Sequence, residues 1–321
     1  MTTKVIGLPT GFRDVMFDEA RTRRSIESRM AAAFEQRGFR EIRPSGIESM
    51  EVYRRGHQGI LERAFRFLDR EDNLLALRAD FTPAIARIAA SRLGSAEPPI
   101  KVWYSGSVFR KIDPTHRGYA EFGQIGAELL GLNSVEGDVE ILRLAMDCLS
   151  ATGIEDVQIH INHAGVFRGI VNSIDLKGHD LRKIKSEIDR KDARGVEAQL
   201  KNLSIDKNIQ EQIHALAVSA GGTDVLAHAR KNIRNQESLN AIGHLEALAS
   251  ALDPWKDKLI FDLAEIDEME YYTGIMIAFL SPGLNREIGM GGRYDSLMKE
   301  FGRDIPAVGF SFNLENLVEL Q

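Results

Sequence analysis

The pattern of apolar positions near the start of the chain predicts a helix followed by short strands. The helix is expected between Asp18, which can cap it, and Gly38, which can stop it. Its buried face is formed by residues at helical spacing, namely Ile26, Met30, Ala33 and Phe34. A short strand follows around Ile42, and Pro44 confines it to a strand end or an edge.

Residues 64–131 carry the pattern of strand pairs. Residues 64–69 and 74–80 predict two strands around a polar turn, followed by a helix with Thr82 as N-cap and Pro83 at its first position. Residues 100–131 predict a long hairpin with a polar, charged loop. A helix over about 138–152 and the strand VQIHI at 157–161 are expected next.

The second half of the chain begins with a helical, charge-rich block at about 165–250. Strand character then returns in KLIFDLAEI, YYTGIMIAFL, REIGMGG and PAVGFSF. Strands on both sides of a helical block predict an α+β fold with a mainly antiparallel sheet and a helical insertion. We expect one main domain over residues 1–321, because no Pro/Ser-rich linker divides the chain.

Composition narrows the class of protein. The chain has 41 basic and 47 acidic residues, a net charge of −6, which disfavours neutralisation of nucleic-acid phosphates as its main task. A single cysteine excludes a disulfide within the chain. No secretory leader or apolar membrane span is apparent, so we expect a cytoplasmic protein without membrane contact.

Polar residues inside apolar strands are the best candidates for a site. Gln124 and Glu128 fall on one face of the second hairpin strand, and Arg110 ends the first strand. An internal salt bridge between Arg110 and Glu128 explains this pattern as well as a binding site does. No zinc pattern, nucleophile elbow or Walker loop is present, so we expect neither a metal ion nor a cofactor.

Five segments occur in the order of the motifs of the histidyl-tRNA synthetase core, a class II aminoacyl-tRNA synthetase. They are LRADFTP at 77–83, VFRKIDPTHRGYAEFGQIGAELLG at 108–131, EYYTG at 270–274, GGRYDSL at 291–297 and PAVGFSFNLENL at 306–317. With the opening LPTGFRDV, the similarity covers nearly the whole chain. The resemblance implies the class II fold, an antiparallel sheet flanked by helices, which dimerises through the segment around Arg40 to Ser49.

The ATP side of the resemblance is incomplete. Asp267 stands before the paired tyrosines, where the synthetases have an arginine, and Asn316 replaces an ATP-contacting arginine. Ile112 and Ala120 replace a glutamate and an arginine of the second motif. A carboxylate in place of a guanidinium would repel the phosphates during adenylate formation. We therefore expect no catalytic residues and no synthetase activity.

The histidine side of the pocket is retained. By position it consists of Asp80, Thr82, Arg110, Gln124, Glu128, Tyr271 and Tyr272. The resemblance implies that Asp80 and Gln124 hold the α-ammonium group of histidine and Arg110 its carboxylate. Glu128 and Tyr272 would meet the two imidazole nitrogens, because a neutral imidazole has one donor and one acceptor nitrogen. The other two residues would line the site.

This combination resembles the family of regulatory subunits of the short-form ATP phosphoribosyltransferase. The resemblance implies a non-catalytic subunit that forms a dimer within a hetero-octamer with the short catalytic subunit. It would enable transfer of the phosphoribosyl group of PRPP to ATP, the first step of histidine biosynthesis, and relay feedback inhibition by histidine. We expect no anticodon-binding domain after residue 321 and no tRNA charging.

Two other functions are compatible with the same residues. A truncated or paralogous histidine-activating ligase would show histidine-dependent exchange of pyrophosphate into ATP, although Asp267 and Asn316 argue against it. A free-standing histidine-binding module would bind histidine but would not act on the catalytic subunit.

Overall fold

The computed structural model describes residues 6–56, 58–111, 118–133, 135–172, 178–202, 205–217, 219–264 and 272–321. Within these residues, a nine-stranded sheet has the order β1-β5-β6-β12-β11-β10-β7-β9-β8, and a three-stranded sheet has the order β2-β4-β3. The strands are β1 (Arg40–Glu41), β2 (Ile47–Ser49), β3 (Arg66–Leu68), β4 (Leu74–Leu77), β5 (Ile100–Phe109), β6 (Glu121–Leu130), β7 (Gln158–His163), β8 (Ala220–Gly221), β9 (Leu259–Asp262), β10 (Ile275–Leu280), β11 (Glu287–Arg293) and β12 (Ala307–Asn313).

Most neighbours in the large sheet are antiparallel, and the pairs β1 with β5 and β7 with β9 are parallel. The predicted long hairpin is β5 and β6. The helices are α1 (Phe17–Gln36), α2 (Met50–Gly56), α3 (Gln58–Arg63), α4 (Thr82–Ser91), α5 (Val135–Thr152), α6 (Ala164–Asn172), α7 (Gly178–Asp189), α8 (Ala193–Asn202), α9 (Lys207–Ala217), α10 (Thr223–Asn232), α11 (Gln236–Ala251), α12 (Asp295–Glu300) and α13 (Leu314–Glu319). The α+β class with a mainly antiparallel sheet is confirmed.

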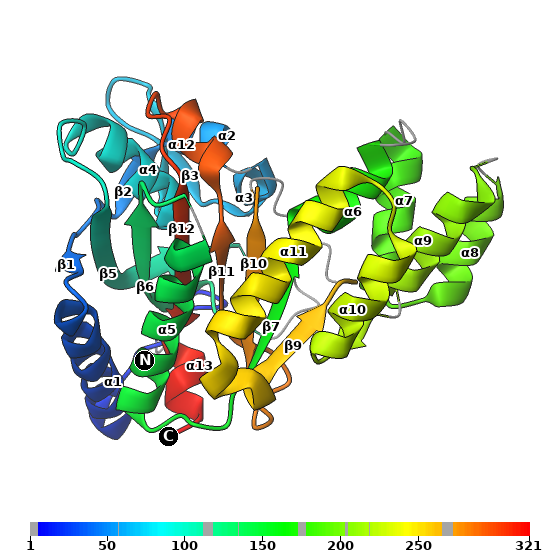
Figure 1. The fold of residues 1–321 in the computed structure, drawn as a ribbon. Helices are drawn as coiled ribbons and strands as arrows, with labels where there is room; N and C mark the ends of the chain where they lie inside the picture. The colour runs from blue at the N-terminus through cyan, green and yellow to red at the C-terminus, as the bar shows by residue number, and fades with distance from the viewer. Residues whose placement is uncertain are drawn as a thin grey trace.

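The two faces of the large sheet support different layers of the core. Helices α1, α5 and α13 lie over one face (Figure 1), where Phe34 of α1 stacks on Trp103 of β5 at 5.5 Å between ring centroids. The next residue of β5, Tyr104, belongs to a second cluster with α4 and α12 on the opposite face. Strand alternation therefore divides β5 between two layers, and the candidate site lies on the Tyr104 side.

The helix starts differ by one or two residues from those expected. Helix α1 begins at Phe17 with Met16 as N-cap, so Asp18 lies in the first turn, where its charge favours the positive end of the helix dipole. Helix α4 begins at Thr82 with Phe81 as N-cap and Pro83 in the first turn. The Thr82 hydroxyl makes no capping bond and instead donates to Glu128. The hydrogen bond from Thr82 to Glu128 of β6 thus takes the place of the N-cap hydrogen bond that the sequence predicts for Thr82.

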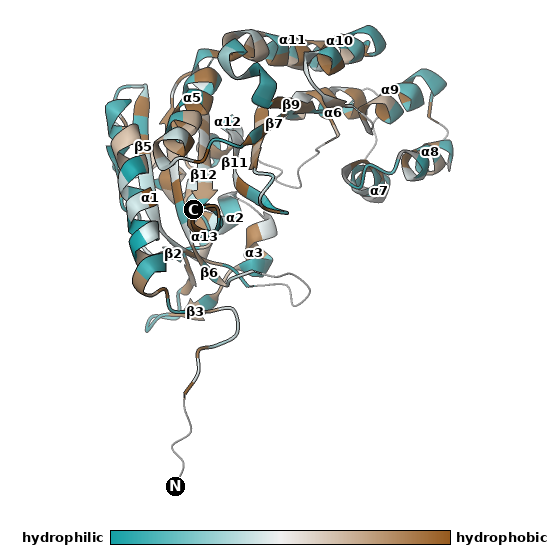
Figure 2. Cartoon of the chain, turned by 90° about the horizontal axis from the view of Figure 1, so that it is seen from below, coloured by the Kyte–Doolittle hydropathy of each residue, from teal (hydrophilic) through white to brown (hydrophobic). Residues whose placement is uncertain are grey.

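Helices α6 to α11, with the short strand β8, occupy the charge-rich part of the chain (Figure 1). Helices α7, α8 and α9 lie farthest from the large sheet in both ribbon views (Figures 1 and 2). Ile170 of α6 and Leu245 of α11 belong to the same hydrophobic cluster as Ile125 of β6. The helical segment and the sheet therefore share one continuous core.

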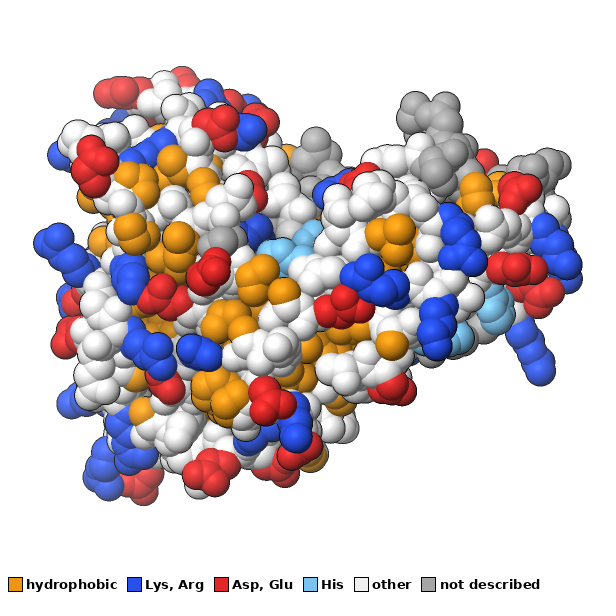
Figure 3. All heavy atoms as spheres, viewed as in Figure 1, with side chains coloured by type: hydrophobic (Ala, Val, Ile, Leu, Met, Phe, Trp, Pro, Cys, Tyr) orange, Lys and Arg blue, Asp and Glu red, His pale blue; other side chains and the backbone are white. Residues whose placement is uncertain are grey.

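The surface carries charges of both signs. Figure 3 shows acidic and basic side chains interspersed on the face that holds α1, α5 and α11, without an extended basic area on that face. The first described residues run away from the body of the molecule (Figure 2), and Ile6 is 95% exposed there. Among the described residues, no helix combines the length and the apolar character needed to cross a membrane.

Candidate functional site

Six of the seven predicted site residues line one small cavity with a free volume of about 30 Å³. They are Asp80, Thr82, Arg110, Gln124, Glu128 and Tyr272. The seventh, Tyr271, lies outside the described residues, as do Asp267 and Ile112. Residues far apart in the sequence are brought together because β6 lies between β5 and β12 in the sheet.

Two glycines make room for the polar side chains of β6. A Cβ atom on Gly126 would lie 2.3 Å from the carbonyl oxygen of Phe310, and one on Gly309 would lie 1.5 Å from Oε2 of Glu128. Gly309 is the register partner of Glu128 across β6 and β12. The Glu128 carboxyl group therefore fills the space that a side chain at position 309 would need.

Glu128 is 1% exposed and accepts hydrogen bonds from three hydroxyl groups. Its Oε1 accepts from Thr82 Oγ1 at 3.1 Å and from Tyr104 Oη at 3.2 Å, and its Oε2 accepts from Tyr294 Oη at 2.5 Å. Burial raises the pKa of Glu128 to about 8, and the hydroxyl bonds only partly offset this effect. The carboxyl group therefore holds its proton at neutral pH while the cavity is empty.

The alternative of a salt bridge between Arg110 and Glu128 is wrong. Arg110 Nη2 lies 3.3 Å from Asp80 Oδ2, and its Nε donates to the carbonyl oxygen of Ala79 at 2.7 Å. Asp80 Oδ1 also accepts from the backbone N–H of Thr82 at 2.9 Å. Arg110 and Asp80 thus neutralise each other's charge at the edge of the cavity. This pair of charges suits a ligand that carries one positive and one negative group.

Gln124 presents an acceptor without a partner. Its Nε2 donates to Ser311 Oγ at 3.3 Å, whereas its buried Oε1 has no hydrogen-bond partner among the described residues. A buried amide oxygen without a donor is unfavourable. An ammonium group in the cavity would satisfy it.

Two residues of the site were missed by the sequence analysis. Tyr104 and Tyr294 both donate to Glu128. The Tyr104 ring stacks on the Phe81 ring with 4.2 Å between the centroids. This contact holds the Tyr104 hydroxyl in position. The alternation of side chains along β5 places Tyr104 on a buried face. Only its register with Gly126 of β6 shows that its side chain faces the same cavity as Glu128.

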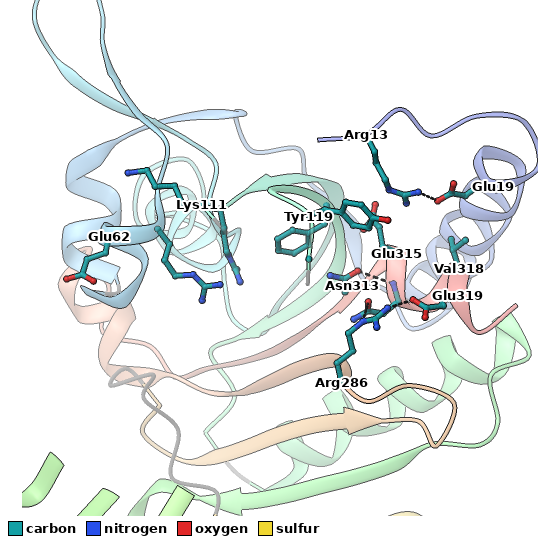
Figure 4. A pocket seen from close by; sticks show the side chains of 15 residues that line it. Arg13, Glu19, Glu62, Lys111, Tyr119, Arg286, Asn313, Glu315, Val318 and Glu319 are labelled. Atoms are coloured by element: carbon teal, nitrogen blue, oxygen red, sulfur yellow. Dashed lines mark hydrogen bonds and ion pairs between the residues drawn. The ribbon is translucent and has the colours of Figure 1, made fainter. Parts of the chain in front are cut away.

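Figure 4 shows a larger cavity, which has a volume of about 1300 Å³. Arg110 lines both this cavity and the first one, so the two adjoin. Its charged lining is nearly balanced, since five basic residues face four acidic ones. The basic residues are Arg13, Arg63, Arg110, Lys111 and Arg286, and the acidic ones are Glu19, Glu62, Glu315 and Glu319. Figure 4 shows the ion pairs of Arg13 with Glu19 and of Arg286 with Glu319.

Asn316 is fixed in the wall of this larger cavity. It accepts from Arg286 Nε at 2.8 Å through Oδ1, and its Nδ2 donates to the carbonyl oxygen of Glu287 at 2.7 Å. Arg286 therefore lies next to Asn316, but Glu319 neutralises its charge. Among the described residues, no group of three or more His, Cys, Asp or Glu side chains could hold a metal ion.

Comparison with known proteins identifies relatives over almost the full chain. The sequence profile of the histidyl-tRNA synthetase family matches residues 11–317. An ATP phosphoribosyltransferase regulatory subunit of Caldanaerobacter subterraneus subsp. tengcongensis is 32% identical over 98% of this chain and 82% of its own length. One from Geobacter metallireducens is 33% identical over 96% of this chain and 72% of its own length.

Solved structures give the same relationship. A structure described as an ATP phosphoribosyltransferase regulatory subunit/histidyl-tRNA synthetase from Bacillus halodurans has a TM-score of 0.90 at 27% identity, over 99% of this chain and 84% of that one. Histidyl-tRNA synthetase from Nostoc has the same fold, with a TM-score of 0.82 at 22% identity over 99% of this chain and 75% of that one. The chain belongs to the histidyl-tRNA synthetase family with its class II fold and, within it, to the ATP phosphoribosyltransferase regulatory subunits.

Proposed function

We propose that the chain is a non-catalytic regulatory subunit that enables a short-form ATP phosphoribosyltransferase catalytic subunit and makes it sensitive to histidine. One observation carries this proposal. Six of the seven positions predicted to bind histidine line a single cavity, while the adjoining cavity has Asn316 where the resemblance places an arginine in a synthetase. The chain would act as one class II-like unit over residues 1–321, with the helical segment at about 165–250 as an insertion.

The chemistry of the small cavity supports histidine as its ligand. The Asp80 carboxylate and the Arg110 guanidinium are placed to exchange their mutual contact for the ammonium and carboxylate groups of an amino acid. Gln124 offers its unpaired amide oxygen to the same ammonium group. Glu128 and Tyr272 line the same cavity and supply a carboxyl group and a phenol for an imidazole. Tyr271 is proposed to line the site as well.

The larger cavity supports the absence of synthetase activity. ATP activation requires positive charge that is free to stabilise the phosphates in the transition state. Glu19 and Glu319 pair with Arg13 and Arg286, so these guanidinium groups would have to leave existing partners. We accordingly propose neither aminoacylation nor tRNA binding for this chain.

The proposed partners are the short catalytic subunit and a second copy of this chain. Self-association through the segment around Arg40 to Ser49 would give a dimer within a hetero-octamer, and the assembly would act in the cytoplasm. Histidine can inhibit such an assembly only if it binds the inactive and active arrangements with different affinity.

Phosphoribosyl-ATP formation by a matching short-form catalytic subunit tests the proposal. The reaction should be measured with and without this chain, each with and without histidine. Activation by the chain, reversed by histidine, is the expected result. The variant Glu128→Ala should keep the activation and lose the reversal, whereas Glu62→Ala in the larger cavity should behave like the unaltered chain. Absence of activation would contradict the regulatory role, and histidine-dependent exchange of pyrophosphate into ATP would contradict the non-catalytic one.

A further inference from the structure

The carboxyl group of Glu128 lies in the interior and has no basic partner among the described residues. The described groups that contact it are the hydroxyls of Thr82, Tyr104 and Tyr294, and it is 1% exposed. Ionisation of a buried carboxyl group is unfavourable unless a positive charge lies next to it. A ligand that carries such a charge would complete this site.

Within the part of the chain that the structure describes, the other charged and titratable groups around the cavity do not supply that charge. Asp80, just before α4, raises the pKa of Glu128 further, and Arg110 at the end of β5 is paired with this same Asp80. The remaining titratable groups are the phenols of Tyr104 on β5, Tyr272 before β10 and Tyr294 after β11. Strand β6 adds the neutral amide of Gln124, and the cavity residues of β11 and β12 are Met290, Gly291, Gly292, Gly309, Phe310 and Ser311.

We propose that Glu128 selects a basic side chain by handing its own proton to the ligand, so that histidine is bound as an imidazolium ion against a carboxylate. This inference rests on the proposed function, because it takes histidine as the ligand. In the binding step, the O–H bond of the Glu128 carboxyl group breaks and an N–H bond forms on the imidazole. The electron pair of that O–H bond stays on the carboxylate, which keeps the hydroxyl donors Thr82, Tyr104 and Tyr294.

The proton balance of this step determines how affinity depends on pH. At pH values between about 6.5, the pKa of free imidazole, and about 8, the pKa of Glu128 in the empty site, Glu128 is protonated and the imidazole of free histidine is neutral. The complex also holds one proton, so binding there exchanges none with solvent. Below this window binding must release a proton, and above it binding must take one up. Affinity should therefore fall on both sides, by up to about tenfold per pH unit.

A ligand of the same shape with a weakly basic ring separates this inference from simple hydrogen bonding. In 2-fluoro-L-histidine the fluorine withdraws electrons from the ring and lowers its basicity, while its size stays close to that of histidine. A proton-accepting role predicts affinity at least about tenfold weaker than that of L-histidine at neutral pH. A ring that only donates or accepts a neutral hydrogen bond would bind about as tightly as histidine.

The experiment is isothermal titration calorimetry of the full chain with both amino acids across roughly pH 5.5 to 9.5. The expected result is a bell-shaped affinity for histidine, weak binding of the fluorinated analogue, and a heat near pH 7.2 that is independent of the ionisation enthalpy of the buffer. Equal affinity of the two ligands would overturn the inference whatever the pH profile, because a neutral imidazole that accepts a hydrogen bond from the Glu128 carboxyl group also gives a complex with one proton; the proposed function would remain intact. Absence of histidine binding at every pH would overturn both.

Two variants locate the effect. Glu128→Gln keeps the shape of the side chain but has no proton to transfer, so histidine affinity should fall by at least about tenfold and its decline above pH 8 should be smaller than in the unaltered chain, leaving only the part due to the α-ammonium group of histidine. Glu62→Gln, an exposed change in the neighbouring cavity, should retain the bell-shaped profile. If the Glu128→Gln variant has a normal thermal transition and its affinity declines above pH 8 as steeply as that of the unaltered chain, Glu128 is not the proton donor.

Discussion

At the scale of single residues, the distance between β12 and the Glu128 carboxyl group depends on a glycine. Gly309 faces Glu128 in the register of β6 and β12, and a methyl group at this position would overlap Oε2. In the sequence, Gly309 is one position within the predicted strand PAVGFSF. Only the packing of two strands that are far apart in the chain shows why a side chain cannot be accommodated there.

The variant Gly309→Ala tests this close approach. Displacement of the Glu128 carboxyl group should abolish histidine binding and lower the free energy of unfolding by about 1–3 kcal/mol, the usual range for overpacking. Calorimetry and thermal denaturation measure the two effects. Gly46→Ala is the matched control, because a Cβ atom there meets no atom within 4 Å. Normal binding by the Gly309→Ala variant would show that the strand can move aside.

His163 makes folding stability sensitive to acid. Burial, and then the neighbouring His244, lower the pKa of His163 to about 3, so the folded chain keeps this ring neutral. The unfolded chain takes up a proton near pH 6.5. The stability that this residue contributes is therefore present above pH 6.5 and is lost as the pH falls from 6.5 towards 3, by about 2 kcal/mol between pH 6.5 and pH 5.

The substitution His163→Asn should remove this part of the acid sensitivity. An Asn side chain can still accept from the backbone N–H of Gly165, as His163 Nδ1 does at 3.0 Å. Urea unfolding at pH 7 and pH 5 should show a smaller loss of stability for the variant than for the unaltered chain. The exposed change His228→Asn should leave the loss unchanged. An equal loss in all three proteins would contradict the assignment to His163.

At the scale of elements, one buried carboxylate joins a helix, a strand and the helical segment. Asp138 of α5 is fully buried, and its Oδ1 accepts from Arg293 Nε at 3.0 Å and Nη2 at 2.6 Å. Its Oδ2 lies 2.7 Å from Nε2 of His244 on α11. Arg293 precedes Tyr294, which contacts Glu128, so this cluster adjoins the candidate site.

The change Asp138→Ala should therefore destabilise more than the loss of a surface ion pair. Arg293 would remain buried without its two hydrogen bonds to the Asp138 carboxylate, and the free energy of unfolding should fall by about 3 kcal/mol in denaturant titrations. Glu246 lies on α11, as His244 does, and Glu246→Ala removes an exposed ion pair with Arg230 of α10, so it should have little effect. Equal effects of the two changes would show that the buried cluster adds no stability of its own.

Elements with a strong local pattern could be predicted from the sequence. The apolar face of α1 and the β5–β6 hairpin follow from periods of 3.6 and two residues. The parallel pairing of β1 with β5 could not be predicted, because nothing in two residues of strand indicates a partner some 60 positions away. Strand β8 was missed for the same reason, since Ala220 and Gly221 show no alternation. Motif order named six residues that line the small cavity, whereas the two tyrosines on Glu128 become apparent only in the tertiary structure.

At the scale of the whole molecule, the three-stranded sheet has an apolar outer face. The register pairs Ile47 with Leu77 and Phe67 with Leu75, which places these four side chains on one face. Ile47 is 46% exposed and Phe67 is 38% exposed. Ile47 also lies in the segment expected to mediate self-association, so this face is suited to contact with a second copy.

The variant Phe67→Glu should weaken self-association. A charge on this face would have to be desolvated in a dimer, so light scattering after size-exclusion chromatography should give a lower mass at equal protein concentration. Ala198→Glu adds the same charge at an exposed position of α8, far from this sheet in sequence, and should leave the mass unchanged. An unaltered mass for the Phe67→Glu variant would move the contact to another surface.

The position of β12 has a consequence for synthesis of the chain on the ribosome. Among the described strands it is the last in sequence, yet it lies between β6 and β11 near the middle of the large sheet. Until residues 307–313 leave the exit tunnel, β6 and β11 cannot both be paired along these edges, and the two halves of the sheet remain separate. Open strand edges promote pairing with other chains. The nascent protein should therefore depend on protection by chaperones until β12 has been synthesised and can pair with both strands.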